Sequence, residues 1–438
     1  MNYIKKIFSP CCLAISLFLL LYTLYKSEII WNGEKKDYYL IYYIISILLI
    51  IFSIFTFYLN QKIKKYLIIS LVSVVGCLYL AEGYLFSKEL IQKEQLSEKE
   101  IEKKYNKKTK LEIYNDLKKI NNKIVMAIYP RSHLKDKNKI LPLSGISNSK
   151  TLFCNENGYS VYESDRYGFN NPDKEWDQNE IEYVLVGDSN THGACVNRPN
   201  DIASVLRTLS NKSALNLGYY LNAPLIEYAT LREYLTSNVK KVVWIYFGNN
   251  IIDLNDELNN KILKNYLNSN DFTQNLKSKQ NEIDDLAIAK LLTKLEKGKA
   301  LYTVREREDK FTSLLIKFIK INYLRNSLFL SPRSEKKLLQ DFKKILKLTK
   351  DLTAKNNSKL FFVYLPGYLH YTDNDYYSSY LSVKKIVNEL NIPFIDLHSE
   401  AFFEKEQSPE KFYARKGGHY NEEGYRKAAE TIYKLTKD

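Results

Sequence analysis

The chain has 438 residues, which is enough for one large domain or two ordinary ones with additional segments. It carries 65 Lys and Arg against 50 Asp and Glu, a formal net charge of +15. The lysines are spread along the whole chain, which argues against a nucleic-acid-binding protein. This charge suits an anionic glycan or lipid headgroups as partners.

Three apolar stretches lie near the N-terminus, at about 9–25, 38–59 and 66–86. Each has close to the roughly 20 residues that span a bilayer, and no small-residue cleavage site follows the first. We therefore expect a membrane anchor of three transmembrane helices over residues 1–87. Basic residues precede the first stretch and link the second to the third: Lys5, Lys6, Lys62, Lys64 and Lys65. The positive-inside rule then favours a cytoplasmic N-terminus and an extracytoplasmic C-terminal domain.

Cysteine positions fit this topology. Cys11, Cys12 and Cys77 fall in the apolar stretches, which leaves Cys154 and Cys195 in the exported part. Two thiols in an oxidising compartment predict a disulfide, and the alternative is two unrelated buried thiols.

Residues 88–149 are predicted to form a helical stalk and linker. The sequence from about 88 to 125 is dense in Lys and Glu, which is typical of an exposed helix. From about 126 to 175 it becomes irregular and rich in turn residues, including the run 164–172, so we expect loops there.

From about residue 181 onward, apolar runs alternate with amphipathic segments, as in a parallel sheet covered by helices. Residues 255–335 interrupt this rhythm, and we expect an insertion that forms a lid or a partner surface. The predicted fold class is α/β, a three-layer α/β/α parallel-sheet domain preceded by the transmembrane helices. The expected strands are 182–186, 213–217, 241–247, 359–365 and 392–397, and the expected helices are about 200–210, 224–237, 335–355, 378–390 and 421–437.

The first strand of this domain ends in Gly187-Asp188-Ser189, which would present a serine hydroxyl at a sharp turn. Such a hydroxyl can act as a nucleophile if a base and oxyanion donors lie nearby. Gly218, Asn249 and His419 also fall at or beyond the ends of predicted strands. Ligands bind outside the carboxyl ends of strands in open α/β sheets, so we expect these residues to converge.

These four blocks resemble the SGNH, or GDSL-type, hydrolase superfamily over roughly residues 150–438, and the loop 164–169 resembles a segment of membrane-anchored bacterial members. The resemblance implies a flavodoxin-like domain with Ser189 as the nucleophile and His419 as the base. It also implies an oxyanion hole, formed by the backbone N–H groups of Ser189 and Gly218 and by the side-chain amide of Asn249.

The sequence departs from the family pattern at two positions. Asn250 stands where the family usually has Asp, and Lys416 stands where the family places the Asp that orients the histidine. Three arrangements remain open: a dyad in which a backbone carbonyl orients His419, a carboxylate from elsewhere such as Asp396 or Glu422, or a domain without activity.

Other polar residues near Ser189 are assigned to the pocket: Asp188, His192 and Asn250. His192 is expected to be a pocket-wall contact, with a role as alternative base left open. The remaining histidines show no metal-ligand spacing, so we expect no catalytic metal and no cofactor.

The expected activity is acyl transfer through an acyl-Ser189 intermediate. Water as acceptor gives an esterase, and a sugar hydroxyl gives an O-acyltransferase. The expected substrate is an envelope or extracellular glycan that carries ester groups, with O-acetyl the favoured group. The expected partners are the lipid bilayer and envelope-biosynthesis proteins. The alternative is a non-catalytic SGNH-like module that binds glycan or a partner. A transporter has little support, since Glu82 is the only acidic residue in the three apolar stretches.

Overall fold

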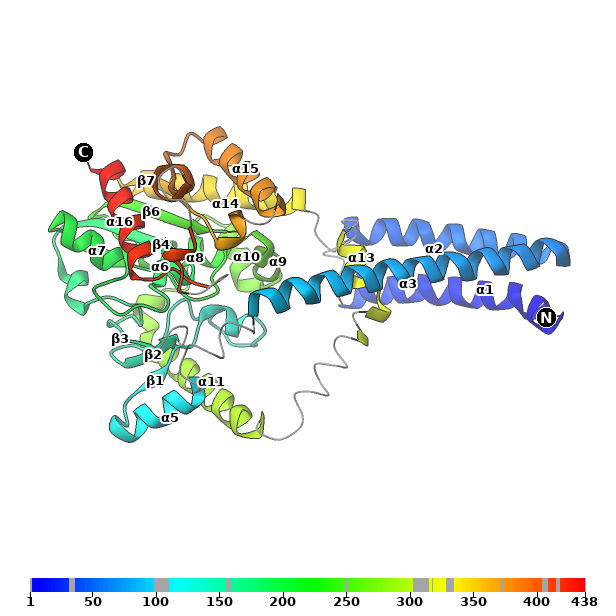
Figure 1. Ribbon diagram of the computed structural model, residues 1–438, viewed down its shortest axis with the longest axis horizontal. Coiled ribbons are helices and arrows are strands. Elements are labelled where there is room, and N and C mark those ends of the chain that lie inside the picture. The colour runs from blue at the N-terminus through cyan, green and yellow to red at the C-terminus, as the bar shows by residue number, and fades with distance from the viewer. Residues whose placement is uncertain are drawn as a thin grey trace. The chain divides into compact units, whose positions relative to one another are not determined.

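The chain divides into two compact units in the computed structural model (Figure 1). The first, which we call the membrane unit, comprises Met1–Glu94 and Arg305–Ser334. The second, the sheet unit, comprises Gln95–Val304 and Glu335–Asp438. The structure describes residues 2–30, 36–97, 110–154, 159–248, 251–301, 315–316, 318–327, 335–371, 374–403, 409–414 and 418–437.

Three long helices dominate the membrane unit. They are α1 (Asn2–Leu24), which continues into the π-helix η1 (Tyr25–Ile30), α2 (Lys36–Phe57) and α3 (Gln61–Ser97). Each contains a segment long and apolar enough to cross a membrane, at Lys6–Ile29, Tyr39–Phe57 and Gln61–Lys88. Most large apolar side chains on these helices are exposed, as expected of surfaces that face lipid. The three predicted apolar helices are therefore confirmed.

A short segment from far along the chain also belongs to the membrane unit. It includes helix α13 (Asn322–Ser327) and packs against α3. The buried carboxylate of Glu82 accepts hydrogen bonds from the backbone N–H groups of Tyr323 (2.9 Å) and Leu324 (2.7 Å). The ring of Phe318 lies 5.7 Å from that of Tyr79. This part of the predicted insertion therefore contacts a membrane helix, whereas its first part, up to residue 301, folds with the sheet unit.

The sheet unit contains a five-stranded parallel sheet in the order β5-β4-β6-β7-β8 (Figure 1). All five predicted strands are confirmed. They are β4 (Ile181–Gly187), β5 (Ala214–Asn216), β6 (Val239–Phe247), β7 (Lys359–Leu365) and β8 (Phe394–Asp396).

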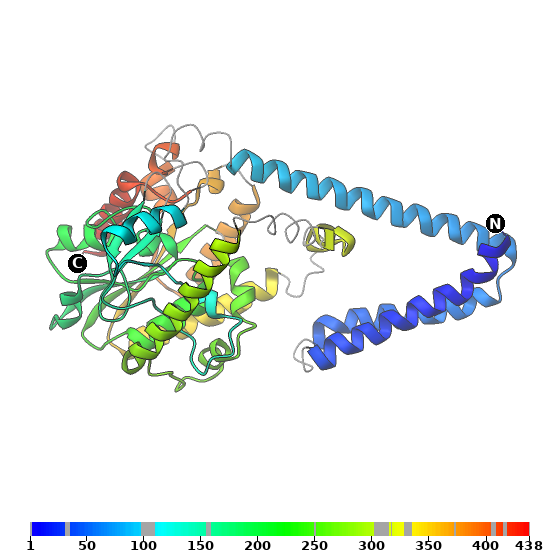
Figure 2. The ribbon, with the colours of Figure 1, turned by 90° about the horizontal axis from the view of Figure 1, so that it is seen from below.

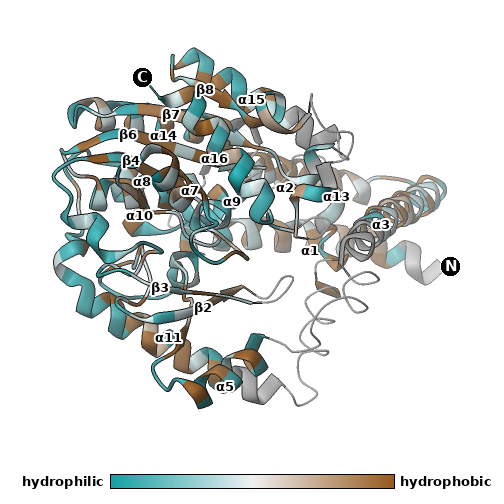
Figure 3. Cartoon of the chain, turned by 60° about the vertical axis from the view of Figure 1, so that its left-hand side comes forward, coloured by the Kyte–Doolittle hydropathy of each residue, from teal (hydrophilic) through white to brown (hydrophobic). Residues whose placement is uncertain are grey.

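Helices cover both faces of this sheet, which gives the expected three layers. One face packs against α8 (Pro224–Tyr234), α14 (Glu335–Lys355) and α15 (Asn374–Glu389), and the other packs against α7 (Ile202–Ser210) and α16 (Glu422–Thr436). Strand β6 shows why the strands are apolar throughout: Trp244 packs on the first face and Val243 on the second. In Figure 3 the strands of this sheet are coloured largely as hydrophobic.

A second, smaller sheet lies where loops and a stalk were predicted. It consists of β1 (Val125–Met126), β2 (Lys150–Cys154) and β3 (Ser160–Glu163). Helix α5 (Lys110–Ile120) packs on it through Ile113 and Tyr114, which contact Leu152, and α11 (Gln280–Leu301) lies beside α5 (Figure 2). The prediction of a stalk is wrong for residues 110–120, because the apolar side of this short helix is buried against the small sheet. The remaining helices of this unit include α6 (Ser189–His192), α9 (Ile251–Glu257) and α10 (Lys261–Asn268).

The strand order places a topological switch point at the end of β4. From β4 the chain proceeds to β5 on one side, and β6 lies on the other side of β4. Ligands of open α/β sheets bind at such a switch point, outside the carboxyl ends of the strands. Ser189 follows β4 directly and therefore lies at this position.

Candidate active site

Ser189 begins helix α6 immediately after β4. The carboxylate of Asp188 caps this helix by accepting a hydrogen bond from the N–H of Asn190 (2.9 Å). A Cβ atom on Gly187 would lie 2.2 Å from Oγ1 of Thr191. Only glycine therefore allows β4 and α6 to approach this closely, and the tight turn presents the Ser189 hydroxyl.

His419 provides a base for this hydroxyl. Its Nε2 lies 2.9 Å from Oγ of Ser189. The histidine directly precedes Tyr420, which forms an antiparallel bridge with Tyr413, and the next residue, Asn421, caps the N-terminus of α16. A neutral imidazole at this distance can take the hydroxyl proton. The structure thus brings together two residues that are 230 positions apart in the sequence.

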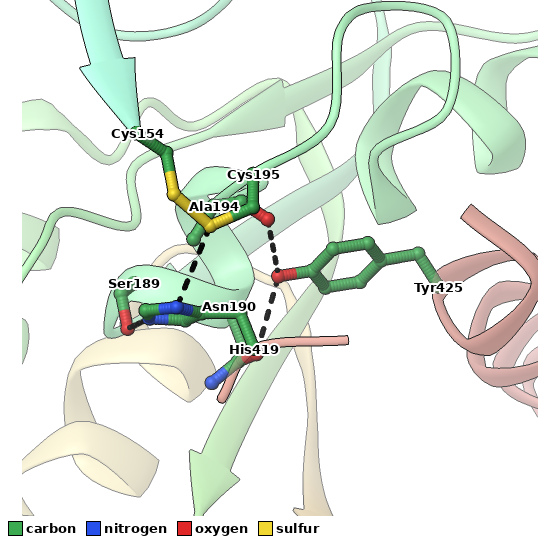
Figure 4. Close-up of a disulfide and its surroundings, with 7 residues drawn as sticks. All are labelled: Cys154, Ser189, Asn190, Ala194, Cys195, His419 and Tyr425. Atoms are coloured by element: carbon green, nitrogen blue, oxygen red, sulfur yellow. Dashed lines mark hydrogen bonds between the residues drawn. A yellow bond between two sulfur atoms is a disulfide. The ribbon is translucent and has the colours of Figure 1, made fainter. Parts of the chain in front are cut away.

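The other ring nitrogen of His419 faces a disulfide. Cys154 and Cys195 are bonded, with their Cα atoms 5.0 Å apart, and Sγ of Cys195 lies 3.6 Å from Nδ1 of His419 (Figure 4). The bond joins β2 to the loop after α6. Tyr425 holds that loop by donating to the carbonyl of Ala194 (3.0 Å). The predicted disulfide is present, and it lies against the base.

The two carboxylates considered for orienting His419 are engaged or exposed elsewhere. Asp396 accepts hydrogen bonds from the hydroxyl of Tyr380 and from Nζ of Lys384 (3.0 Å). Glu422 is exposed in the first turn of α16. Lys416, which replaces the family's Asp, lies outside the described residues.

Gly218 packs against Thr191 and His192 of α6, and its N–H group already has an acceptor. It donates to Oδ1 of Asn216 (2.9 Å), whose Nδ2 in turn donates to the carbonyl of Thr191 (2.6 Å). A Cβ on Gly218 would lie 2.5 Å from Cβ of Thr191, so glycine is required here by close packing against α6. This arrangement differs from the expected oxyanion role of the Gly218 N–H. Asn249 and Asn250 lie outside the described residues.

The second backbone donor predicted for the oxyanion hole is the N–H group of Ser189. As the first helical residue of α6, Ser189 has an N–H group without an acceptor inside the helix.

His192 lies behind the pocket wall. Its ring stacks on that of Phe153 at 4.2 Å and contacts those of Tyr162 and Tyr219. Neither ring nitrogen has a hydrogen-bond partner among the described residues. Burial lowers the pKa of His192 to about 3, so the ring is neutral and packs as an aromatic group. Asp188, the other described residue assigned to the pocket, is buried as the helix cap.

A cavity of about 150 Å³ opens beside His419. Its walls are mainly aromatic and small apolar side chains, with one lysine. Six of its eight residues were not predicted, because they come from segments that the sequence analysis assigned to the stalk, to loops or to turns. The lining comprises Lys110, Ala127, Tyr129, Phe153, Cys154, Ala194, Tyr220 and His419.

The loop 164–172 is hydrogen-bonded to the backbone of segments that carry the site. Asn170 donates to the carbonyl of His192 (2.9 Å), and Asn171 donates to the carbonyl of Asn216 (3.0 Å). The loop is organised around Asp165, which is buried and accepts hydrogen bonds from the N–H groups of Tyr167 and Phe169. Burial raises the pKa of Asp165 to about 6. The resemblance pointed to this loop, but no sequence pattern assigned its hydrogen bonds.

No family model and no curated protein matches the sequence. The solved structures that it resembles include the acetyl xylan esterase AlAXEase, at 14% identity and TM-score 0.34 over 59% of this chain and 100% of that one. Another is a member of the lipolytic protein G-D-S-L family from Veillonella parvula DSM 2008, at 13% identity and TM-score 0.34 over 58% of this chain and 98% of that one.

Proposed function

We propose that this protein is a membrane-anchored serine esterase or O-acyltransferase that acts through an acyl-Ser189 intermediate. The 2.9 Å contact between Nε2 of His419 and Oγ of Ser189, at the switch point of a parallel sheet, carries the proposal. Nucleophile, base and an adjacent cavity are the parts that acyl transfer requires.

In the first half-reaction, Oγ of Ser189 attacks the carbonyl carbon of the ester while His419 takes its proton. The tetrahedral intermediate then expels the alcohol, which receives that proton from His419. In the second half-reaction, water or a sugar hydroxyl attacks the acyl-serine, with His419 again acting as base. Water yields an esterase, and a sugar hydroxyl yields an O-acyltransferase.

The cavity and the anchor support an O-acetylated glycan as the substrate. A volume of about 150 Å³ suits a short acyl group rather than a long chain. Three apolar helices hold the chain at a membrane, and the distribution of Lys5, Lys6 and the lysines of 62–65 favours a sheet unit outside the cytoplasm. Envelope glycans and the proteins that build them would then be within reach.

Covalent labelling tests this function. The full chain in detergent is treated with a fluorophosphonate probe and assayed with p-nitrophenyl acetate. We expect labelling and turnover by the wild type, loss of both in Ser189→Ala, and retention of both in the matched control Ser210→Ala, whose hydroxyl bonds the carbonyl of Leu206 on α7. A folded wild-type chain that neither labels nor turns over the ester would reject the proposal.

A non-catalytic glycan-binding module is the second candidate. It is favoured by the Gly218 N–H, which donates to Asn216 instead of pointing to an empty oxyanion position. Glycan binding by a folded chain that resists the probe would support this candidate.

A further inference from the structure

One cation belongs to the cavity beside His419. Lys110, the first residue of α5, lines the cavity together with Phe153 and Tyr129. Desolvation by burial, and secondly the charge of Lys294, together lower the pKa of Lys110 to about 8. No carboxylate among the described residues offsets these effects.

A second cation lies over the cavity wall. Nζ of Lys294, on α11, is 4.1 Å from the ring centroid of Tyr129. Burial lowers the pKa of Lys294 as well, followed by the charge of Lys290. Lys290 differs from both, because its Nζ pairs with the two carboxylate oxygens of Asp136 at 2.7 and 2.8 Å. Of these three lysines, only Lys290 is neutralised by a described carboxylate.

Two ammonium groups without carboxylate partners among the described residues are costly in an apolar setting. Burial disfavours the charged form of both, and a neighbouring ammonium group adds to this, that of Lys294 for Lys110 and that of Lys290 for Lys294. A bound anion would reverse both effects, since an opposite charge nearby favours the charged form of each lysine. The aromatic walls formed by Tyr129, Phe153 and Tyr220 provide flat surfaces for a sugar ring next to that anion.

We propose that Lys110 and Lys294 bind an anionic group of the substrate, a carboxylate or a phosphate on the acylated sugar, and so position its ester at Ser189. This inference rests on the proposed function for the reaction but concerns recognition alone. It names the substrate class as anionic O-acylated saccharides. Neutral acylated sugars would fill the same cavity without pairing either lysine.

Binding to the inactive Ser189→Ala chain tests the proposal without requiring turnover. Three probes are titrated calorimetrically into the full chain in detergent: an O-acetylated hexose, the corresponding O-acetylated uronic acid, and an O-acetylated hexose phosphate. We expect at least one anionic probe to bind about tenfold more tightly than the neutral one, which corresponds to about 1.4 kcal/mol. The preferred probe distinguishes carboxylate from phosphate. Equal affinities for all three would overturn the proposal.

Lysine variants test which side chains cause the preference for an anionic probe over the neutral one. In Lys110→Met the preference for the anion should fall toward one, and in Lys110→Arg it should persist. Lys119→Met serves as the matched control, because Lys119 is on the same helix and its side chain is 77% exposed. A preference that survives Lys110→Met and Lys294→Met together would overturn the assignment. Fluorophosphonate labelling of the wild type reports separately on the proposed reaction, so the two ideas fail independently.

Discussion

Sγ of Cys195 lies 3.6 Å from Nδ1 of His419, while Nε2 of the same ring faces Oγ of Ser189 at 2.9 Å. A disulfide sulfur thus lies where a serine triad places a carboxylate. The sulfur carries no charge, so it can limit the position of the ring but cannot stabilise the imidazolium as an Asp does. The disulfide is therefore in direct contact with the base of the candidate site.

Breaking this disulfide should lower kcat more than it changes KM. Reduction frees the loop that carries Cys195, so the imidazole loses a fixed neighbour. Removing the orienting carboxylate of a serine triad lowers kcat by about 10⁴-fold, and we expect a smaller decrease in kcat here. Ester hydrolysis is measured with and without reductant, and the double variant Cys154→Ser/Cys195→Ser should match the reduced wild type. Full activity of that double variant would contradict the idea.

Zinc should inhibit the reduced chain but not the oxidised one. The ligand atoms of Cys154, Cys195 and His419 lie within 4.8 Å of one another. Freed thiolates and an imidazole are ligands that Zn²⁺ prefers, and binding would occupy the base. The measurement is fluorophosphonate labelling of Ser189 with and without zinc in both redox states. Equal zinc sensitivity of the two states, or of the variant lacking both cysteines, would argue against this site.

Acid should destabilise the sheet unit partly through His192. Its pKa falls from 6.5 to about 3 on burial, so between these values the unfolded chain binds more protons. Stability from this group is full above pH 6.5 and is lost as the pH falls, with a slope of up to about 1.4 kcal/mol per pH unit. His192→Phe keeps the ring stacked on Phe153 and removes the titration. As the pH is lowered from 7 to 5, we expect the Tm of this variant to increase relative to that of the wild type. A difference in Tm that does not change with pH would show that His192 is not a source of the acid sensitivity.

Glu82 should hold the segment around α13 on α3. In Glu82→Leu the N–H groups of Tyr323 and Leu324 lose their acceptor, at a cost of about 1–3 kcal/mol for each buried donor. Hydrogen exchange of these two amides should accelerate in Glu82→Leu and change less in Glu82→Gln, which retains one oxygen. The control Ser87→Ala alters the same helix at a hydroxyl that donates to the carbonyl of Tyr84. Unchanged exchange in Glu82→Leu would show that the carboxylate does not hold this segment.

The sequence predicted those parts of the fold whose pattern repeats over many residues. Strand β6 is apolar on both faces, and α14 has the predicted bounds of 335–355, because each buries a continuous surface. Ser189 and His419 could be placed because strand ends converge in an open α/β sheet.

Features that depend on a single distant contact could not be predicted. Strand β2 has five residues, too few to show a period, and its burial depends on α5. Asn216 captures the N–H of Gly218 through a side-chain contact that no spacing encodes. Lys110 lies in a charged stretch that is typical of a solvent-exposed helix, yet in the fold it lines the cavity.

The chain passes between the two units three times, after residues 94, 304 and 334. A protease that cuts once between residues 98 and 109 would separate the three long helices from the rest of the polypeptide. The larger fragment would still carry the segment that contacts Glu82, Tyr79 and Phe86, and so would remain attached to α3. Release of the sheet unit from the membrane unit would then require more than one cut, so a single proteolytic event would not separate the two units.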